Sequence, residues 1–187
     1  MPRLSSFFSV SLDGFFADER GSVDWSHDPN RDPEWNAFVS GNASGSSQLL
    51  MGRKTYEMMV AFWPTPAAKQ AMPAVAEGMN AAPKHVVSRT VKEATWNNTR
   101  IIATDLEEEV RRLKAASGPD ITTLGSGSIV SQLAQAGLVD EFQVVTIPIL
   151  IGKGRHMFGD IRQPLRMRTL RSRAFNNGNV VTWYAPA

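Results

Sequence analysis

The segment at residues 121–129 of the 187-residue chain, ITTLGSGSI, has the residue types of an anion-binding turn. It reads as a strand, a loop of glycine and serine, and the start of a helix. Glycines let an anionic group approach the backbone, and the free N–H groups of a first helical turn point toward it. The residues expected to bind a pyrophosphate are Gly125, Ser126, Gly127, Ser128 and Ile129. The alternative is a tight turn that needs glycine for its geometry alone, because the full G-x-G-x-x-G pattern with its ribose-binding acid is missing.

A second candidate is the turn GRKT at residues 52–55, which also follows a strand and opens a helix. Gly52 permits close approach to the backbone, and Thr55 supplies a hydroxyl and an N-cap. Arg53 and Lys54 add positive charge, and a guanidinium can donate forked hydrogen bonds to a terminal phosphate. The alternative is a capped helix start with two solvated cations.

A third strand end repeats this formula. Ser88, Arg89 and Thr90 place a guanidinium between two hydroxyls. Ligands of open α/β folds bind at the carboxyl ends of the strands. Three such loops together predict one phosphate-bearing ligand, with Ser88 and Arg89 among its contacts.

The long polar loop that begins at Asp13 carries the candidate groups for chemistry on a substrate. Asp13 is the first candidate acid, with Asp32 and Glu34 behind it, and each can equally cap a turn or a helix. Trp25 can stack on a flat ring or fill the core. Such loops often act as lids. The chain has no cysteine, and its three histidines lack metal-ligand spacing, so we expect no metal site.

Positioning these loops requires alternating strands and helices. Strand-length apolar clusters occur at residues 7–12, 48–51, 85–88, 100–103, 121–124, 141–151, 165–175 and 180–184. Helical patterns occur at residues 33–39, 55–62 and 128–136, and after a cap at Thr104. The sequence NNG at residues 176–178 indicates a hairpin. We expect a single α/β domain over residues 1–187, with a mainly parallel sheet, helices on both faces and an antiparallel hairpin at the end.

Composition narrows the class of protein. The hydrophobic fraction is 42% and the formal net charge is +2. No apolar run approaches the roughly 20 residues of a membrane helix, and the start does not resemble a signal peptide, so we expect a cytoplasmic protein without a membrane partner. The basic excess is local and alternates like the wet side of a strand, so no nucleic-acid partner is expected. Its members are Arg162, Arg166, Arg168, Arg171 and Arg173. The apolar run at residues 144–151 could pair across a homodimer.

Taken together, the motifs resemble the dihydrofolate-reductase-like superfamily. They are most similar to the reductase domain of bifunctional riboflavin-biosynthesis enzymes and its small stand-alone relatives. The resemblance rests on SLDG at 11–14, MGRKT at 51–55, GSG at 125–127, GLVDE at 137–141, and PILIGKG at 148–154 followed by Phe158. It covers essentially the whole chain, and the order of the motifs is more specific than any one of them.

The resemblance implies an eight-stranded sheet with NADPH lying across the strand ends. Carried over to this chain, the residues that would hold the adenosine phosphates are Arg53, Lys54, Thr55, Ser88 and Arg89. Residues 125–129 would hold the pyrophosphate, and Trp25 would flank the cofactor. Two departures concern the substrate. Leu124 stands where the riboflavin-type reductases carry an acid, and residues 52–55 replace their Asp-Asp-Pro stretch.

The expected function is therefore an NADPH-dependent reductase that transfers a hydride to a small heterocycle. The substrate is open between a 5-amino-6-ribosylamino-uracil type, a dihydrofolate type and an unrelated compound. Asp32 and Glu34 only approximate the position of the acid on the first helix of dihydrofolate reductases. The alternative is a nucleotide-binding module of the same fold without turnover.

Overall fold

Short apolar stretches of the chain pair into one eight-stranded sheet, in the order β4-β3-β2-β5-β1-β6-β8-β7. The computed structural model describes residues 1–27, 32–44 and 46–187. The strands are β1 (Leu4–Ser11), β2 (Gln48–Gly52), β3 (Lys84–Val87), β4 (Thr99–Ile102), β5 (Ile121–Leu124), β6 (Glu141–Ile147), β7 (Met167–Ala174) and β8 (Val180–Pro186). All eight strands overlap the stretches expected from the sequence.

Strands β1 to β6 run parallel, while β8 pairs antiparallel with both β6 and β7. The β7–β8 turn contains Gly178, whose φ of +87° is a conformation that glycine adopts without strain. This arrangement confirms the predicted parallel sheet with a hairpin at its end. Because β2 lies between β3 and β5, the loops that follow these three strands start next to one another.

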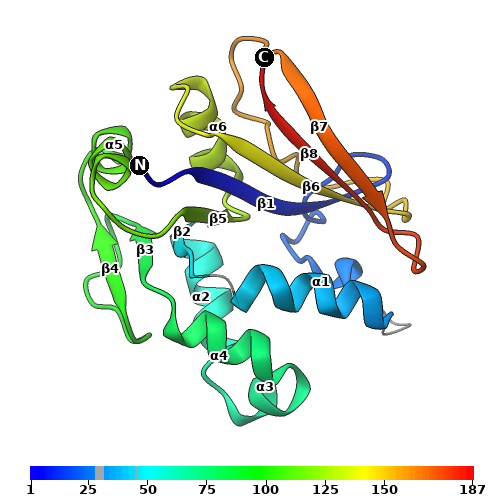
Figure 1. Cartoon of the computed structure of the whole chain (residues 1–187), viewed down its shortest axis with the longest axis horizontal. Helices are drawn as coiled ribbons and strands as arrows, with labels where there is room; N and C mark the ends of the chain where they lie inside the picture. The colour runs from blue at the N-terminus through cyan, green and yellow to red at the C-terminus, as the bar shows by residue number, and fades with distance from the viewer. Residues whose placement is uncertain (28–31, 45) are drawn as a thin grey trace.

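Helices cover both faces of the sheet, as predicted. They are α1 (Pro33–Ser44), α2 (Arg53–Phe62), α3 (Pro66–Ala71), α4 (Pro73–Ala81), α5 (Leu106–Ala115) and α6 (Gly127–Gln135), with a short 3-10 helix η1 (Asp24–Ser26). Figure 1 shows α5 and α6 on one side, and α1, α2 and α4 on the other. Alternate residues of β1 serve the two layers: Leu4 and Phe8 pack with Leu133 of α6, whereas Phe7 packs with Trp35 of α1.

Two helices and one strand end differ from the sequence expectation. α3 and α4 were not expected, although Pro66 and Pro73 stand at their first positions, where a fixed φ suits a helix start. β6 ends at Ile147 rather than at residue 151, because Pro148 has no N–H for the ladder. The cap of α5 is Asp105, not Thr104: the Asp105 carboxylate accepts a hydrogen bond from a backbone N–H of the first turn.

The edge strand β7 and the interior strand β6 differ in exposure and pairing. β7 is an edge strand, and all eight of its residues are exposed. Three of the five clustered arginines lie on it, and the Arg171 guanidinium sits 4.3 Å above the ring of Trp183. β6, by contrast, is paired on both sides, so its part of the run at 144–151 has no free edge for a second copy. Within the described residues, no helix is long and apolar enough to cross a membrane.

Candidate functional site

The loops after β2, β3 and β5 meet around one cavity of about 850 Å³, which we call the loop cavity. The predicted residues that line it are Gly52, Arg53, Lys54, Thr55, Ser88, Arg89, Ser126, Gly127, Ser128 and Ile129. Of the predicted binding residues, Trp25 and Gly125 lie outside this lining. The structure therefore brings together segments that are separated by more than 70 positions in the sequence.

Two helix N-termini open into the loop cavity. α6 follows Ser126, and α2 follows Gly52, and neither start is capped by a side-chain hydrogen bond. Thr55 is thus inside α2 and is not its N-cap, as the sequence had suggested. The first-turn N–H groups of a helix lack partners within the helix, and its dipole favours an anion there by about 0.3–1 kcal/mol. α5 differs, because the Asp105 carboxylate already occupies its N-terminus.

Ser126 joins two of the loops. Its hydroxyl accepts a hydrogen bond from the N–H of Gly52 (2.9 Å), lies 3.0 Å from the Thr55 hydroxyl and donates to the Leu124 carbonyl (3.1 Å). Ser126 has a left-handed backbone with φ +62°. These contacts give the Thr55 and Ser126 hydroxyls a positioning role, whether or not they also reach a ligand.

The cations of the cavity differ in how they are engaged. The Arg53 guanidinium donates to both oxygens of Glu57, at 2.9 and 3.0 Å. The side chains of Lys54 and Arg89 have no hydrogen bond or ion pair among the residues that the structure describes. The Ser88 hydroxyl accepts from the N–H of residues 90 and 91, which holds the loop around Arg89. Among the cations of these three loops, Lys54 and Arg89 are therefore the most available to a phosphate.

A fourth wall of the cavity was not found from the sequence. It includes Phe16, Arg155 and His156, from the loops after β1 and β6. The N–H groups of Phe16 and Ala17 donate to the Arg155 carbonyl, and the N–H of Arg155 donates to the Ala17 carbonyl. The one local signal is Gly154, where a Cβ would collide with the carbonyl oxygen of Ala17. This wall adds a further guanidinium to the site.

The two glycines of the loop after β5 are required by the fold itself. A Cβ at Gly127 would lie 2.6 Å from the carbonyl oxygen of Met157, and one at Gly125 would lie 3.0 Å from the Phe16 ring. Gly125 also has a φ of +53°. Space for a bound pyrophosphate is thus not needed to explain either glycine.

Asp32 and Glu34 are neighbours, since the N–H of Glu34 donates to the Asp32 carboxylate, and each of the three candidate acids has protein partners. The Asp13 carboxylate accepts from the Ser11 hydroxyl (2.6 Å) and the N–H of Gly152 (2.7 Å), and these bonds hold its pKa below the ordinary value. Asp32 is buried and accepts from two backbone N–H groups. Glu34 pairs with Arg173 at 2.6 Å. The positions of these carboxylates fit structural roles, and the structure does not bring them to the loop cavity.

Trp25 is not among the residues that line the loop cavity. It packs against the cluster of Trp35, Val145 and Phe175 on the α1 side of the sheet, and its buried indole N–H has no hydrogen-bond partner among the described residues. A role beside the far end of a long cofactor remains a prediction. The described residues hold no group of three or more metal-ligating side chains.

The chain is similar in sequence and in fold to several known proteins. The profile of the RibD C-terminal domain family matches residues 2–181. The uncharacterized protein YyaP of Bacillus subtilis is 30% identical over 177 residues, which are 94% of this chain and 90% of YyaP. A putative riboflavin biosynthesis protein from Shewanella sp. PV-4 has a TM-score of 0.74 at 25% identity, with 99% of each chain covered. A diaminohydroxyphosphoribosylaminopyrimidine deaminase/5-amino-6-(5-phosphoribosylamino)uracil reductase from Thermotoga maritima has a TM-score of 0.68 at 16% identity, with all of this chain and 57% of that chain covered.

Proposed function

From the premise that the chain belongs to the RibD C-terminal domain family, we propose that it is a reductase that uses NADPH to reduce a small heterocyclic compound. Family membership supports a reductase-like role, and the cofactor and the substrate type are our proposal. When bound, NADPH supplies a hydride from its nicotinamide ring. The protein's own part is to bind, orient and shield the reactants.

One observation carries the cofactor assignment: two uncapped helix N-termini line the same cavity as three cations whose side chains have no hydrogen bond or ion pair among the described residues, Lys54, Arg89 and Arg155. NADPH carries two anionic groups, a pyrophosphate and a 2′-phosphate. The α6 N-terminus suits the first, because backbone N–H groups and the helix dipole act together there. Lys54 and Arg89 suit the second, because charge-assisted hydrogen bonds to phosphate need donors that are free.

The charges of the loop cavity agree with this assignment. The charged residues in its lining, apart from histidine, are four cations, Arg53, Lys54, Arg89 and Arg155, and two acids, Asp105 and Asp160. One of the acids, Asp105, is already engaged as the cap of α5. The cavity volume of about 850 Å³ lies within the range of small-molecule and cofactor sites.

A second candidate function is a nucleotide-binding module without turnover. The contacts of three carboxylates favour it. Asp13, Asp32 and Glu34 are each engaged by protein groups, so none of these three is free to donate a proton to a substrate. A site of that kind would bind NADPH as well as an enzyme does. Only the consumption of NADPH separates the two functions.

Calorimetric titration of the purified protein with NADPH and with NADH tests the cofactor. We expect micromolar binding of NADPH and weaker binding of NADH, because only NADPH carries the 2′-phosphate. The absence of heat and of any thermal shift at millimolar NADPH would refute the assignment. Steady loss of absorbance at 340 nm with one of a panel of pterins and pyrimidines would identify an enzyme, and binding without loss across the panel would favour the module.

A further inference from the structure

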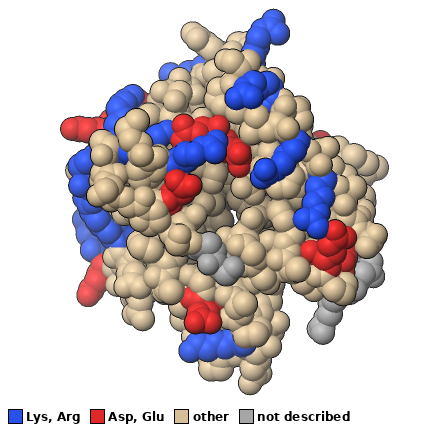
Figure 2. Space-filling view, viewed as in Figure 1, with Lys and Arg blue, Asp and Glu red and all other residues tan. Residues whose placement is uncertain are grey.

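A second cavity, of about 410 Å³, lies on the other side of α2. Its walls come from β1, β2, β5 and β6 above and from α1, α2 and α4 below, and we call it the sheet-face cavity. Figure 2 shows that the molecule is hollowed near the centre of this face, between the sheet and the helical layer. The neighbouring residues Met58 and Met59 of α2 line the loop cavity and the sheet-face cavity respectively.

The body of the sheet-face cavity is apolar. Phe7, Leu124, Met59 and Trp63 are only half-buried although they point into the interior layer, so their apolar surface faces the cavity. Pockets of this size with apolar walls and a few placed polar groups are typical binding sites for small ring compounds. Leu124 adds no hydrogen-bonding group at the end nearest the loop cavity.

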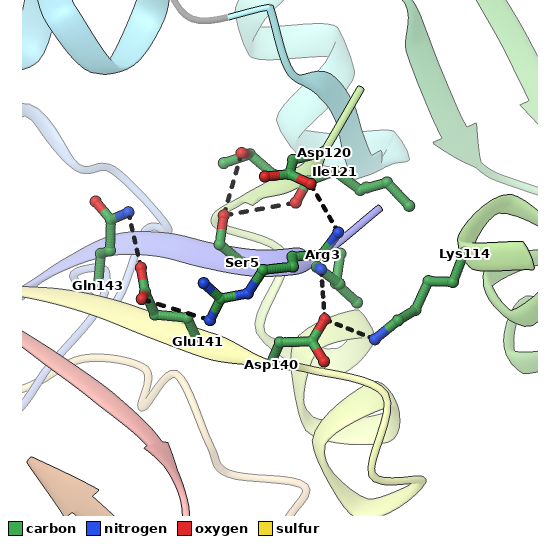
Figure 3. Close-up of polar contacts among 10 residues, drawn as sticks. Arg3, Ser5, Lys114, Asp120, Ile121, Asp140, Glu141 and Gln143 are labelled. Carbon is green, nitrogen blue, oxygen red and sulfur yellow. Dashed lines mark hydrogen bonds and ion pairs between the residues drawn. The ribbon is translucent and has the colours of Figure 1, made fainter. Parts of the chain in front are cut away.

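The polar groups gather at the opposite end, near the start of the central strands. Figure 3 shows Glu141 between Arg3 and Gln143. The Glu141 side chain is only 17% exposed, and its two side-chain contacts are long, 3.8 Å to the Arg3 guanidinium and 3.4 Å to the Gln143 amide. Ordinary N–H···O hydrogen bonds measure about 2.7–3.2 Å. The carboxylate therefore keeps the capacity to accept from a donor in the cavity.

The charges at this end differ from those of the loop cavity. Arg3, Asp120 and Glu141 are the charged members of the lining, one cation against two carboxylates. The Arg3 side chain is 61% exposed, and its backbone N–H donates to Asp120 at 2.8 Å. An anionic ligand would meet a carboxylate excess in a largely apolar space, which disfavours it.

We propose that the sheet-face cavity binds a flat ring with N–H donors directed at Glu141, neutral or cationic and without a phosphate. Hydride transfer requires the nicotinamide and the acceptor ring to be in contact, and α2 separates this cavity from the loop cavity, so the proposal concerns a further ligand site and not the hydride acceptor. It stands on the cavity and on Glu141 alone. The absence of a phosphate separates this ligand class from phosphoribosyl compounds.

Methionine methyl NMR tests the site directly, because Met59 and Met79 line the sheet-face cavity and Met58 lines the loop cavity. The probes are benzamidine, a flat ring with an N–H-rich cation, and phenyl phosphate, its anionic counterpart. We expect benzamidine to shift the methyl signals of Met59 and Met79 and to leave Met58 in place. Phenyl phosphate should leave Met59 and Met79 unchanged. Benzamidine without effect on both methyls, or phenyl phosphate with an equal effect, would overturn the proposal.

Glu141→Gln provides the second arm, since it keeps the shape and removes the charge. A lost charge-assisted contact should weaken benzamidine binding about tenfold or more. Glu108→Gln, an exposed change on α5 across the sheet, is the matched control and should have no effect. Equal affinity of the Glu141→Gln and control proteins would overturn the role of Glu141, and the wild-type methyl shifts remain decisive if Glu141→Gln does not fold.

A parallel titration with NADPH keeps this proposal separate from the proposed function. NADPH should shift Met58. Benzamidine binding at Met59 and Met79 without any response to NADPH would support the sheet-face site and contradict the reductase assignment. NADPH binding without any benzamidine response would do the reverse.

Discussion

The loop cavity and the sheet-face cavity lie on two sides of the same helix but are built from different parts of the chain. The loop cavity is formed by backbone turns, helix N-termini and cations at the ends of strands. The sheet-face cavity is formed by side chains from the middle of strands and helices, with Glu141 at one end. Backbone N–H groups and the side chains of lysine and arginine suit phosphate groups. An apolar cavity with one hydrogen-bond acceptor instead selects ligands by the shape of the ring and the position of its donors.

This difference teaches which residues each cavity depends on. The loop cavity relies on close approaches between backbone segments, so small changes there should disturb the fold as well as binding. The sheet-face cavity relies on packing at one wall, where α4 ends, and on one partly satisfied carboxylate. The following changes should therefore separate the two cavities.

The largest effect on stability should come from replacing a helical glycine with alanine, and each cavity offers one such glycine. Gly127→Ala places a Cβ 2.6 Å from the Met157 carbonyl oxygen, while a Cβ at Gly41 of α1 meets nothing within 4 Å. We expect Gly127→Ala to lower the free energy of unfolding by about 3 kcal/mol, the upper end for overpacking, because the neighbour is backbone. Gly41→Ala should raise it by up to about 1 kcal/mol through helix propensity. Urea denaturation measures both, and equal stability of the two variants would contradict this account.

The next effect concerns the cations of the loop cavity. Arg89→Ala should weaken NADPH about tenfold to a hundredfold and NADH far less, since a charge-assisted hydrogen bond to the 2′-phosphate is worth about 1.5–3 kcal/mol. Arg53→Ala is the matched control and should have a smaller effect, because Arg53 is engaged by Glu57. Calorimetry at low and high salt tests this, and the gap between the cofactors should narrow at high salt. A larger loss of NADPH affinity for Arg53→Ala would show that Arg53, and not Arg89, binds the 2′-phosphate.

Lys84 offers a change at the wall of the sheet-face cavity. It is 1% exposed, and its ammonium donates to the carbonyl oxygens of Met79 (2.9 Å), Asn80 (3.2 Å) and Ala82 (2.6 Å) at the end of α4. Lys84→Met should lower stability by about 1–2 kcal/mol by leaving buried carbonyls unpaired. It should also weaken benzamidine but not NADPH. The same loss for both ligands would indicate a general loosening of the fold.

Lys84 also makes the free energy of unfolding depend on pH. Burial lowers the pKa of Lys84 to about 8 from 10.5. Below pH 8 the amine is protonated in both the folded and the unfolded chain, and the full cost of burying the charge is present. Between pH 8 and 10.5 the unfolded chain holds the extra proton, so stability rises with pH. Wild type should therefore gain stability relative to Lys84→Met over this interval, and denaturation curves with a constant difference from pH 7 to 10 would refute it.

The smallest effect concerns the hydroxyls that join two loops. Thr55→Val and Ser126→Ala should each lower stability by about 0.5–1.5 kcal/mol. Because the two hydroxyls contact each other at 3.0 Å, the double variant should lose less than the sum. Additive losses in a double-mutant cycle would show that each hydroxyl acts separately.

The sequence predicted the strands and the three loops well because both have local signals. Strand-length apolar clusters mark all eight strands, and hydroxyl residues together with glycine or arginine mark the turns that follow strands. The short helices α3 and α4 lacked a long apolar stripe and were missed, although Pro66 and Pro73 mark their starts. Strand ends were less accurate, since β6 stops at a proline within an apolar run.

The parts of the site that were missed arise from contacts distant in sequence. Arg155 reaches the loop cavity because its backbone pairs with Ala17, almost 140 positions earlier. Glu141 faces a cavity whose other walls come from six further elements, and Phe7 and Met79 resemble ordinary core residues in the sequence. Leu124 was singled out only as a departure from the riboflavin-type reductases, not as the wall of a cavity. Lys84 resembles an exposed lysine of a strand in the sequence, but in the structure the end of α4 covers it. No local pattern distinguishes these residues, because their surroundings exist only after the layers pack.

The exposure of β7 has a consequence for how copies of this chain meet one another. An unpaired strand edge is a template for another strand, and proteins limit such pairing with charged side chains. Arg168, Arg171 and Arg173 lie along this edge, and of the three only Arg173 has an acidic partner, Glu34, among the described residues, so two copies aligned edge to edge would bring guanidinium groups close together. The arginine-rich stretch on β7 is therefore expected to disfavour edge-to-edge association of this chain.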